Sequence, residues 1–280
     1  MRLQLLSDLH LERQPDFMPQ AADDVDVLVL AGDIGSYQSG SLLRSDDFGL
    51  GRFSPLNPHA PWKRVLYVPG NHEFDALEFD DAYARLRSVC DGLGIEWLER
   101  EVICIGSVRF VGTTLWSDFE AFARAESDLT RQLRLRDKAF RAANFYLRKN
   151  TTLNNGEPVL AEGMRELALT CQAWLKAALA EPFAGTTVVV THFAPTLRSA
   201  DPRYGLVPGT AGFCNALDDL LPLAQLWLHG HLHCVNEFVV QGKAHGAAYA
   251  CRVVANPLGY ASKDEQSAFR ERLVIEVPDL

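Results

Sequence analysis

The chain lacks the features that mark membrane, secreted and nucleic-acid-binding proteins. No apolar run approaches the roughly 20 residues of a membrane span. Met1 leads almost directly into a predicted strand, so we expect no signal peptide. Basic residues are the minority, with 27 Lys and Arg against 36 Asp and Glu and a net charge of −9. Phosphate-backbone recognition normally needs a basic face, so a nucleic-acid partner is disfavoured. A phosphate substrate stays open, because a bound cation reverses the charge locally.

The six cysteines form no paired motif. There is no CxxC pair and no dense framework, and without a secretory signal a disulfide set is not expected. Cys104, Cys171 and Cys251 lie in apolar stretches and are predicted to be buried thiols. A zinc-binding role for Cys234 is disfavoured. We therefore expect a cytoplasmic, reducing location and no membrane partner.

Length and patterning favour one large α/β domain over residues 1–280. The 48% of apolar residues supports a substantial core. Strands alternate with helices early in the chain and become hairpin-like later, which predicts two packed sheets with helices outside. The predicted elements include a helix at 78–91, a hairpin at 101–116, a helix at 158–180, and late strands at 235–240, 252–254 and 273–276.

Three segments outside this pattern are candidates for substrate specificity: residues 34–63, 117–160 and 194–213. The second is predicted to be a helical insert. Between residues 117 and 150, eight Lys and Arg outnumber five Asp and Glu, so this segment is locally basic in an acidic chain. Two interpretations stay open: a solvated helical face, and a lid over an anionic substrate.

Seven residues with metal-binding side chains follow predicted strands. The strands are predicted at 3–6, 25–31, 65–68, 187–191 and 226–228, and the residues are Asp8, His10, Asp33, Asn71, His192, His231 and His233. Strand ends that deliver carboxylates, imidazoles and an amide to one sheet edge make a site for two divalent ions. Two ions together catalyse phosphoester hydrolysis.

Spacing indicates which of these side chains share an ion. In extended backbone, residues i and i+2 point to the same face. Asp8 and His10 can therefore reach one ion, and the same argument applies to His231 and His233. Asp33 is the natural bridge, because a carboxylate has two oxygens and can bind both ions.

The donor set restricts the metal. Asn71 offers a neutral carbonyl oxygen, and the remaining donors are carboxylates and imidazoles without thiolate. Such a set suits Mn²⁺, Fe²⁺ or Zn²⁺, and we expect Mn²⁺. Mg²⁺ is disfavoured, because four imidazoles are present.

The order of these motifs resembles the calcineurin-like metallophosphoesterase superfamily. The likeness runs from residue 3 to about residue 240 and rests on Asp8-x-His10, Gly32-Asp33, Gly70-Asn71-His72-Glu73, His192 and Gly230-His231-x-His233. It is greater to bacterial phosphodiesterase-type members than to protein phosphatases. It implies a four-layer α/β/β/α sandwich of two mixed β-sheets flanked by helices, with a dinuclear site at the strand ends.

The resemblance also implies how the site works. One ion would be held by Asp8, His10, Asp33 and His233, and the other by Asp33, Asn71, His192 and His231. A metal-bridging hydroxide would attack phosphorus, with the developing charge stabilised by the ions. His72 would stay off the metals and act as the general acid.

One departure from the superfamily pattern concerns the partner of His72. Many relatives carry a second Asp three residues after the Gly-Asp pair, often followed by Arg in protein phosphatases. Ser36 and Tyr37 stand at these places. The carboxylate that would orient His72 is therefore missing from its expected position, and a protein phosphatase is disfavoured.

Several further residues receive weaker predictions. His229 is predicted to pack beside the site or to support it, while His59 and His245 are predicted to lie in loops or on the surface. Arg203 and Tyr204, in the loop after His192, are candidates for contacting a substrate phosphate or base.

The predicted function is a dinuclear-metal-dependent phosphodiesterase acting on a small or medium-sized phosphoester. A phosphomonoesterase and a nuclease are the enzymatic alternatives. A catalytically silent metal-binding scaffold is disfavoured, because such proteins usually lose ligands and all seven are present here. No pattern in the chain indicates the oligomeric state.

Overall fold

The computed structural model describes residues 1–244 and 246–277, and its elements follow the predicted order. The helices are α1 (Phe79–Leu93), α2 (Leu129–Leu147) and α3 (Ala161–Ala180). The strands are β1 (Arg2–Leu6), β2 (Val27–Ala31), β3 (Val65–Val68), β4 (Glu96–Trp97), β5 (Glu101–Ile105), β6 (Val108–Thr113), β7 (Leu153–Asn154), β8 (Glu157–Pro158), β9 (Thr186–Thr191), β10 (Leu226–His229), β11 (Asn236–Ala244), β12 (Ala247–Ala255) and β13 (Val274–Glu276). Short 3-10 helices include η2 (His72–Phe74) and η4 (Pro208–Gly212).

Two mixed sheets form the centre of the fold. The first has the order β13-β1-β2-β3-β4, and the second has the order β11-β12-β10-β9-β6-β5. Strands β1 to β4 are parallel in the first sheet, and β12, β10, β9 and β6 are parallel in the second. The antiparallel strands β13, β11 and β5 lie at sheet edges. The carboxyl ends of the parallel strands are therefore free to supply a site.

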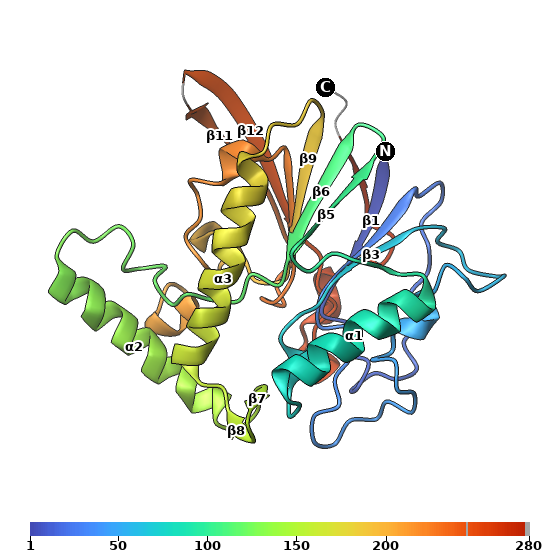
Figure 1. Ribbon diagram of the computed structural model, residues 1–280, viewed down its shortest axis with the longest axis horizontal. Coiled ribbons are helices and arrows are strands. Elements are labelled where there is room, and N and C mark those ends of the chain that lie inside the picture. The colour runs from blue at the N-terminus through green and yellow to red at the C-terminus, as the bar shows by residue number, and fades with distance from the viewer. Residues whose placement is uncertain (245, 278–280) are drawn as a thin grey trace.

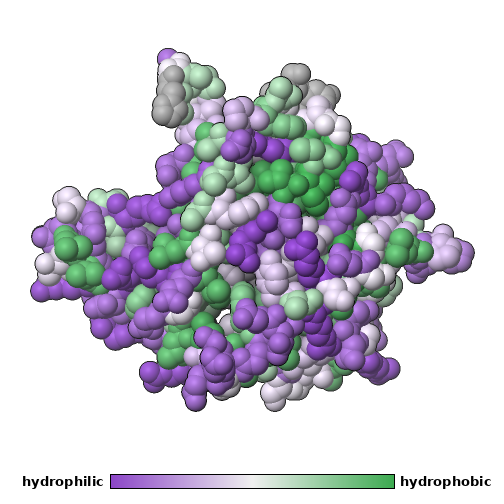
Figure 2. All heavy atoms as spheres, viewed as in Figure 1, coloured by the Kyte–Doolittle hydropathy of each residue, from purple (hydrophilic) through white to green (hydrophobic). Residues whose placement is uncertain are grey.

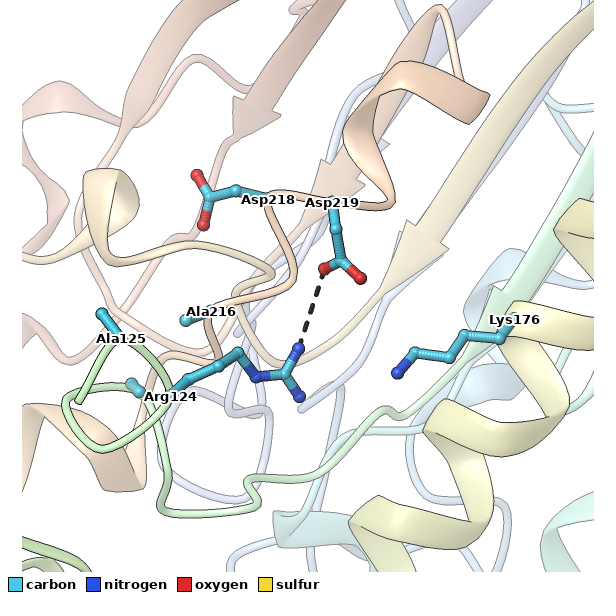
Figure 3. A pocket seen from close by; sticks show the side chains of 7 residues that line it. Arg124, Ala125, Lys176, Ala216, Asp218 and Asp219 are labelled. Atoms are coloured by element: carbon cyan, nitrogen blue, oxygen red, sulfur yellow. Dashed lines mark ion pairs between the residues drawn. The ribbon is translucent and has the colours of Figure 1, made fainter. Parts of the chain in front are cut away.

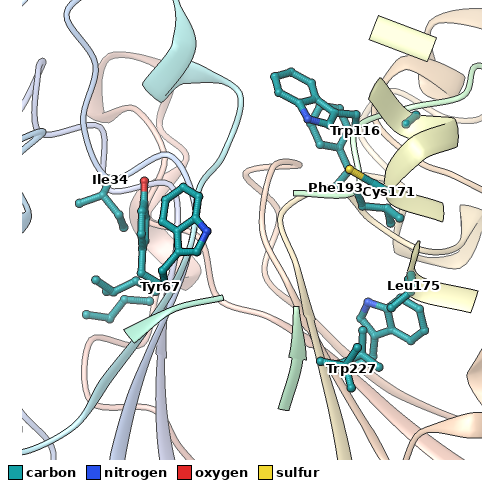
Figure 4. Packing of buried hydrophobic residues seen from close by; sticks show 14 of the residues in the cluster. Ile34, Tyr67, Trp116, Cys171, Leu175, Phe193 and Trp227 are labelled. Carbon is teal, nitrogen blue, oxygen red and sulfur yellow. The ribbon is translucent and has the colours of Figure 1, made fainter. Parts of the chain in front are cut away.

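Buried side chains alternate between the two faces of each sheet, and they form two separate hydrophobic clusters. In β2, Val27 and Val29 belong to a cluster that both sheets share, whereas Leu28 and Leu30 belong to a cluster that also contains helix residues. Successive strand residues point to opposite faces. One cluster therefore fills the space between the sheets, and the other lies under the helices, as Figure 4 shows for Tyr67 on one side and for Trp227 and α3 on the other.

Helices cover the outer faces of both sheets. In Figure 1, α1 lies beside the first sheet and α3 beside the second, which gives the four-layer α/β/β/α sandwich. Helix α1 ends at Gly94, which adopts a left-handed conformation with φ 68° that glycine accommodates without strain. Helix α2 begins at Asp128, whose side chain accepts a hydrogen bond from the Arg131 backbone amide, and it extends away from the sheets.

The predicted elements are confirmed in type, with differences at their ends. The late strands β11 and β12 are longer than predicted, because they pair with each other over nine residues each. The predicted burial of Cys104 is wrong: its side chain is exposed, whereas Cys171 and Cys251 are buried. Cys104 lies on the edge strand β5, where Val102 is also exposed. Among the described residues, no helix combines the length and the apolar character that crossing a membrane requires.

Candidate metal centre

The structure brings the predicted ligands together at the carboxyl ends of β1, β2, β3, β9 and β10. They form two groups in which the donor atoms lie within 4.8 Å of one another; one is Asp8, His10, Asp33 and His233, and the other is Asp33, His192 and His231. The Asn71 side-chain oxygen lies 3.2 Å from Nε2 of His192 and so adjoins the second group. Asp33 belongs to both groups, as a bridging carboxylate must. The grouping is the one that the superfamily resemblance implies, and ligation itself stays a prediction.

The argument from extended backbone is wrong for His231 and His233. Both residues have positive φ, 74° and 48°, and their side chains enter different groups. Asp8 and His10 also have positive φ, 53° and 46°, yet they share a group. Non-glycine residues with positive φ cost about 1–3 kcal/mol each, and such residues concentrate at functional sites.

Carboxylates behind the site fix two of the imidazoles. Nδ1 of His10 lies 3.1 Å from the Glu12 carboxylate, and Nδ1 of His233 lies 2.6 Å from that of Glu265. Both Nε2 atoms then face the centre, where they lie 2.9 Å apart. Hydrogen bonds of this kind hold metal-binding histidines in one orientation. Neither Glu12 nor Glu265 was predicted; Glu12 stands two residues after a predicted ligand, but Glu265 has no signal in the sequence.

Two buried atoms in the second group support a metal site. His192 Nδ1 donates to the Ala31 carbonyl oxygen at 2.8 Å, which turns Nε2 inward. Nε2 of His231 is buried and has no hydrogen-bond partner among the described residues, and Oδ2 of Asp33 lies 3.2 Å from Nε2 of His192. Burial lowers the pKa of His231, so its nitrogen lone pair stays available. An unpartnered buried imidazole nitrogen beside a carboxylate fits a divalent ion.

Charges in the centre are strongly coupled. Burial alone would raise the pKa of Asp33, but the neighbouring His192 and His72 hold it well below its usual range. Burial alone would lower the pKa values of His192 and His233, but the carboxylates of Asp33 and Asp8 raise each to about 9. In the metal-free protein these two histidines are therefore protonated at neutral pH.

His72 lies at the mouth of the centre and outside both ligand groups. Its Nε2 is 3.9 Å from Oδ2 of Asp33, and its side chain is 26% exposed. Its Nδ1 is hydrogen-bonded to the Asp75 carboxylate. Although burial opposes protonation, Asp75 and Asp33 hold the pKa of His72 well above its usual value. A histidine with Nδ1 fixed and Nε2 facing the centre is arranged to give a proton.

Asp75 belongs to a polar network that sequence reasoning missed. Asn150, just after α2, donates to Asp75 and also to Gln38 at 2.9 Å. Gln38 in turn reaches Glu12 at 3.4 Å, behind His10. The segments 34–63 and 117–160 therefore both contribute a side chain beside the centre. In the sequence, the presence of a carboxylate three residues after His72 could have indicated that Asp75 is its partner.

Glu73 joins two of the strand ends that carry ligands. Its buried carboxylate accepts hydrogen bonds from the backbone amides of Asp33, Ile34 and Gly70, at 3.1, 2.6 and 2.8 Å. Burial and the nearby Asp33 raise the pKa of Glu73 to about 8. Glu73 therefore holds the turn after β2 against the turn after β3.

The remaining predicted residues lie around the centre or away from it. Arg203 pairs with Asp201 at 2.7 Å and donates to the His233 carbonyl at 3.4 Å, while Tyr204 is exposed. His229 is buried and hydrogen-bonded to Ser199 at 3.0 Å, in the packing role predicted for it. His59 is exposed, and His245 lies outside the described residues.

Two surface pockets differ in their relation to the centre. One, of about 610 Å³, adjoins it and is lined by Arg13, Gln14, Gln38, Tyr260, Ala261, Ser262 and Lys263. The Tyr260 ring in this pocket stacks on His10 at 4.2 Å. The other, of about 540 Å³, contains no candidate ligand, and its Arg124 pairs with Asp219 at 3.7 Å (Figure 3). We therefore associate only the first pocket with the chemistry.

Comparisons with known proteins identify the family of this chain. The family model for calcineurin-like phosphoesterases matches residues 1–235. Among solved structures, the crystal structure of a phosphopantetheinyl hydrolase from Mycobacterium tuberculosis is similar, with a TM-score of 0.63 and 19% identity over 95% of this chain and 92% of that chain. No curated protein sequence matches at a significant level. The match over most of the chain shows that this protein is a metal-dependent phosphoester hydrolase belonging to the calcineurin-like phosphoesterase family.

Proposed function

We propose that the protein is a phosphodiesterase with two divalent ions, most suitably Mn²⁺, held by the seven predicted ligands. The observation that carries the metal site is the pair of donor groups that share Asp33, together with the unpartnered Nε2 of His231. Two ions bound there would lower the pKa of a shared water and neutralise charge on the phosphate. The domain that performs this reaction would span residues 1–280.

His72 acts on the leaving group in this proposal. Its Nε2 faces the centre, and Asp75 and Asp33 raise its pKa in the metal-free protein, so it is arranged to give a proton to the departing oxygen. Asp75 holds Nδ1 and favours the charged ring. The proton is most useful when the leaving oxygen is a poor leaving group, such as an alkoxide.

The surroundings of the centre favour a diester over a monoester. Arg13 and Lys263 line the pocket beside the centre, so its charge suits both kinds of ester. The 610 Å³ pocket offers room for the additional substituent of a diester.

The similar solved structure is that of a phosphopantetheinyl hydrolase. At 19% identity this likeness shows the fold, and a substrate of that kind is a proposal for this chain. We also propose a cytoplasmic location, which suits the six free thiols.

A direct test compares a diester with a monoester. Metal-stripped protein reloaded with Mn²⁺ is assayed for kcat/KM on bis-(p-nitrophenyl) phosphate and on p-nitrophenyl phosphate. We expect a clear preference for the diester. A preference for the monoester would show a phosphatase, and no hydrolysis of either ester by protein that retains two ions would contradict the whole proposal.

A further inference from the structure

The pocket beside the candidate metal centre is basic, although the chain is acidic. It has a volume of about 610 Å³, and three segments of the chain line it: Arg13 belongs to the first, Gln38 to the second and Lys263 to the third. Among the described residues that line it, only Arg13 and Lys263 are charged, whereas the whole chain has a net charge of −9. A concave site with this charge attracts an anion.

The two cations of the pocket form no ion pair within residues 1–244 and 246–277. The Arg13 guanidinium donates only to the backbone carbonyl oxygens of residues 39 and 40, at 3.5 and 3.3 Å. The Lys263 ammonium lies over the neighbouring tyrosine ring, 4.8 Å from its centroid. Burial would raise the pKa of Glu265, but its hydrogen-bond partner His233 lowers it, and Lys263 contributes to this effect. Both cations are exposed and can bind an anionic group.

The pocket adjoins the side of the centre on which His72 lies. The Tyr260 ring stacks on His10 with the ring centroids 4.2 Å apart, and the His10 ring lies 5.2 Å from the His72 ring. A second connection runs from Gln38 through Asn150 to the carboxylate that holds His72. His72 acts on the leaving group in the proposed function. A substituent that occupies the pocket is therefore the leaving alcohol.

We infer that the pocket binds a second phosphate group, which is carried on the leaving alcohol of a small-molecule phosphodiester. This inference rests on the proposed phosphodiesterase function and specifies its substrate class. A dianionic phosphate matches two cations, because Arg13 can donate two parallel hydrogen bonds and Lys263 supplies a point charge. Ser262 also lines the pocket, and its hydroxyl group adds a neutral donor.

The reaction leaves the second phosphate unchanged. A hydroxide derived from water forms a bond to the phosphorus of the diester, and the bond from this phosphorus to the leaving oxygen breaks. The leaving oxygen takes its proton from His72, and the proton that the water lost restores His72. The products are a phosphomonoester and an alcohol whose phosphate group is held by Arg13 and Lys263.

Other basic parts of the surface fit an anionic group less well. Asp218 and Asp219 line the pocket of about 540 Å³, and its Arg124 pairs with Asp219 at 3.7 Å (Figure 3). The lobe that α2 forms is mostly hydrophilic in the view of Figure 2, and no residue of α2 lines either pocket. Its exposed cations, such as Arg134 and Lys138, therefore face solvent.

The test compares two phosphodiesters that share a methyl group and a three-carbon leaving alcohol. In one, the leaving alcohol ends in a phosphonate, which stands for the second phosphate and resists hydrolysis. In the other, the phosphonate is an uncharged dimethyl ester. Release of methyl phosphate by Mn²⁺-loaded full-length protein gives kcat/KM for each. We expect the charged ester to be favoured by about tenfold or more, the usual effect of hydrogen bonds to a charged group.

Three double variants assign the preference to the pocket. Arg13→Gln with Lys263→Gln removes both cations and should bring the ratio of the two kcat/KM values to about one. Arg13→Lys with Lys263→Arg keeps both charges and should keep the ratio well above one. Arg134→Gln with Lys138→Gln makes the same charge change at exposed positions of α2 and should leave the ratio unchanged. A matching thermal unfolding midpoint shows that each variant is folded.

Several outcomes would overturn the inference. A ratio of about one in the unmodified protein, or an equal loss in the α2 variant, would contradict a phosphate subsite in the pocket. Release of methanol in place of methyl phosphate would show that the charged substituent is not the leaving group. Hydrolysis of bis-(p-nitrophenyl) phosphate distinguishes the two levels: without it the proposed function fails, and with it only the inference about the pocket fails.

Inorganic phosphate is another source of the same chemistry and needs its own measurement. It is added to the reaction with the uncharged ester, in the unmodified protein and in Arg13→Gln with Lys263→Gln. If it changed the rate only in the unmodified protein, while the charged ester had no advantage, the pocket would bind free phosphate and the inference would be wrong. Equal inhibition of both proteins, with the charged ester favoured, supports the subsite for the leaving alcohol.

Discussion

His72 and Asp75 form a hydrogen-bonded pair within one short turn. The Asp75 carboxylate binds Nδ1 of His72 from three residues further along the chain. Ser36, at the place where many relatives carry an Asp, makes a local contact instead, accepting from the Gln38 backbone amide at 3.2 Å. The carboxylate that the sequence lacks at position 36 is thus present beside the histidine, supplied by Asp75.

Replacing Asp75 should impair leaving-group protonation selectively. In Asp75→Asn, His72 loses the charge that holds its ring and raises its pKa. We expect kcat on an alkyl phosphodiester to fall by about tenfold or more, with a much smaller loss on bis-(p-nitrophenyl) phosphate, whose leaving group needs no proton. Asp81→Asn, at an exposed position of α1, is the matched control. Equal losses on the two esters would assign Asp75 a purely structural role.

Removing His72 should separate metal binding from turnover. His72→Ala deletes a side chain that lies outside both ligand groups, so we expect two ions per chain to remain. Turnover of an alkyl diester should fall by about 10²–10⁴-fold, the usual contribution of a general acid. The measurements are metal content by mass spectrometry and kcat for that ester. Hydrolysis at the unmodified rate would show that His72 does not act on the substrate.

Metal binding should release protons at neutral pH. His192 and His233 have pKa values of about 9 in the metal-free protein, so both are protonated at pH 7 and must lose a proton to bind an ion. Apparent metal affinity should therefore rise with pH up to about 9 and level off above it. Calorimetry in two buffers of different ionisation enthalpy counts the protons. Glu265→Gln removes a carboxylate that raises the pKa of His233, so fewer protons should be released at pH 8.

The same shifts predict how metal-free protein responds to pH. For His192 and His233, the folded pKa of about 9 lies above the ordinary histidine value of 6.5. Their contribution to stability is therefore complete below pH 6.5 and is lost as pH rises through 9. Urea unfolding of metal-free protein across this range provides the measurement. The free energy of unfolding is compared with that of His192→Asn. If the difference between the two proteins grew between pH 6.5 and 9, the sign assigned here would be wrong.

Close backbone approach at Gly70 should make it intolerant of a side chain. A Cβ at this position would lie 2.1 Å from Oδ1 of Asp33 and 2.5 Å from its backbone nitrogen. Gly70→Ala should therefore destabilise the fold by about 1–3 kcal/mol, as overpacking does, and weaken metal binding. Gly92→Ala, in α1 with nothing within 4 Å, should be neutral or stabilising by up to about 1 kcal/mol. Similar unfolding midpoints for the two variants would contradict this account.

The positions of the candidate ligands could be predicted because the parallel strands end at one edge of each sheet. Asp33 follows the apolar strand β2, and His192 follows β9 with its valines 188–190, so both positions could be predicted from the pattern. Spacing alone did not show that His231 and His233 belong to different donor groups, because positive φ values turn the two side chains toward different groups. The local backbone geometry, which depends on tertiary contacts, determines which group each histidine joins.

Contacts between distant segments account for most of what the sequence did not reveal. Asn150 reaches Asp75 and Gln38 from 75 and 112 residues away. Glu265 reaches His233 from a segment after the last predicted motif. No periodicity or short motif in the sequence predicts such long-range contacts. The exposure of Cys104 has a similar cause, because its strand pattern matched a buried strand while the fold placed that strand at an edge.

Metal stoichiometry with and without Asp33 tests the central claim most directly. Equilibrium dialysis against Mn²⁺ should give two ions per chain for the unmodified protein. Asp33→Ala should lose both, because Asp33 is the residue that the two donor groups share. Retention of two ions in Asp33→Ala, in protein that remains folded, would contradict the bridged two-ion centre on which the proposed hydrolysis depends.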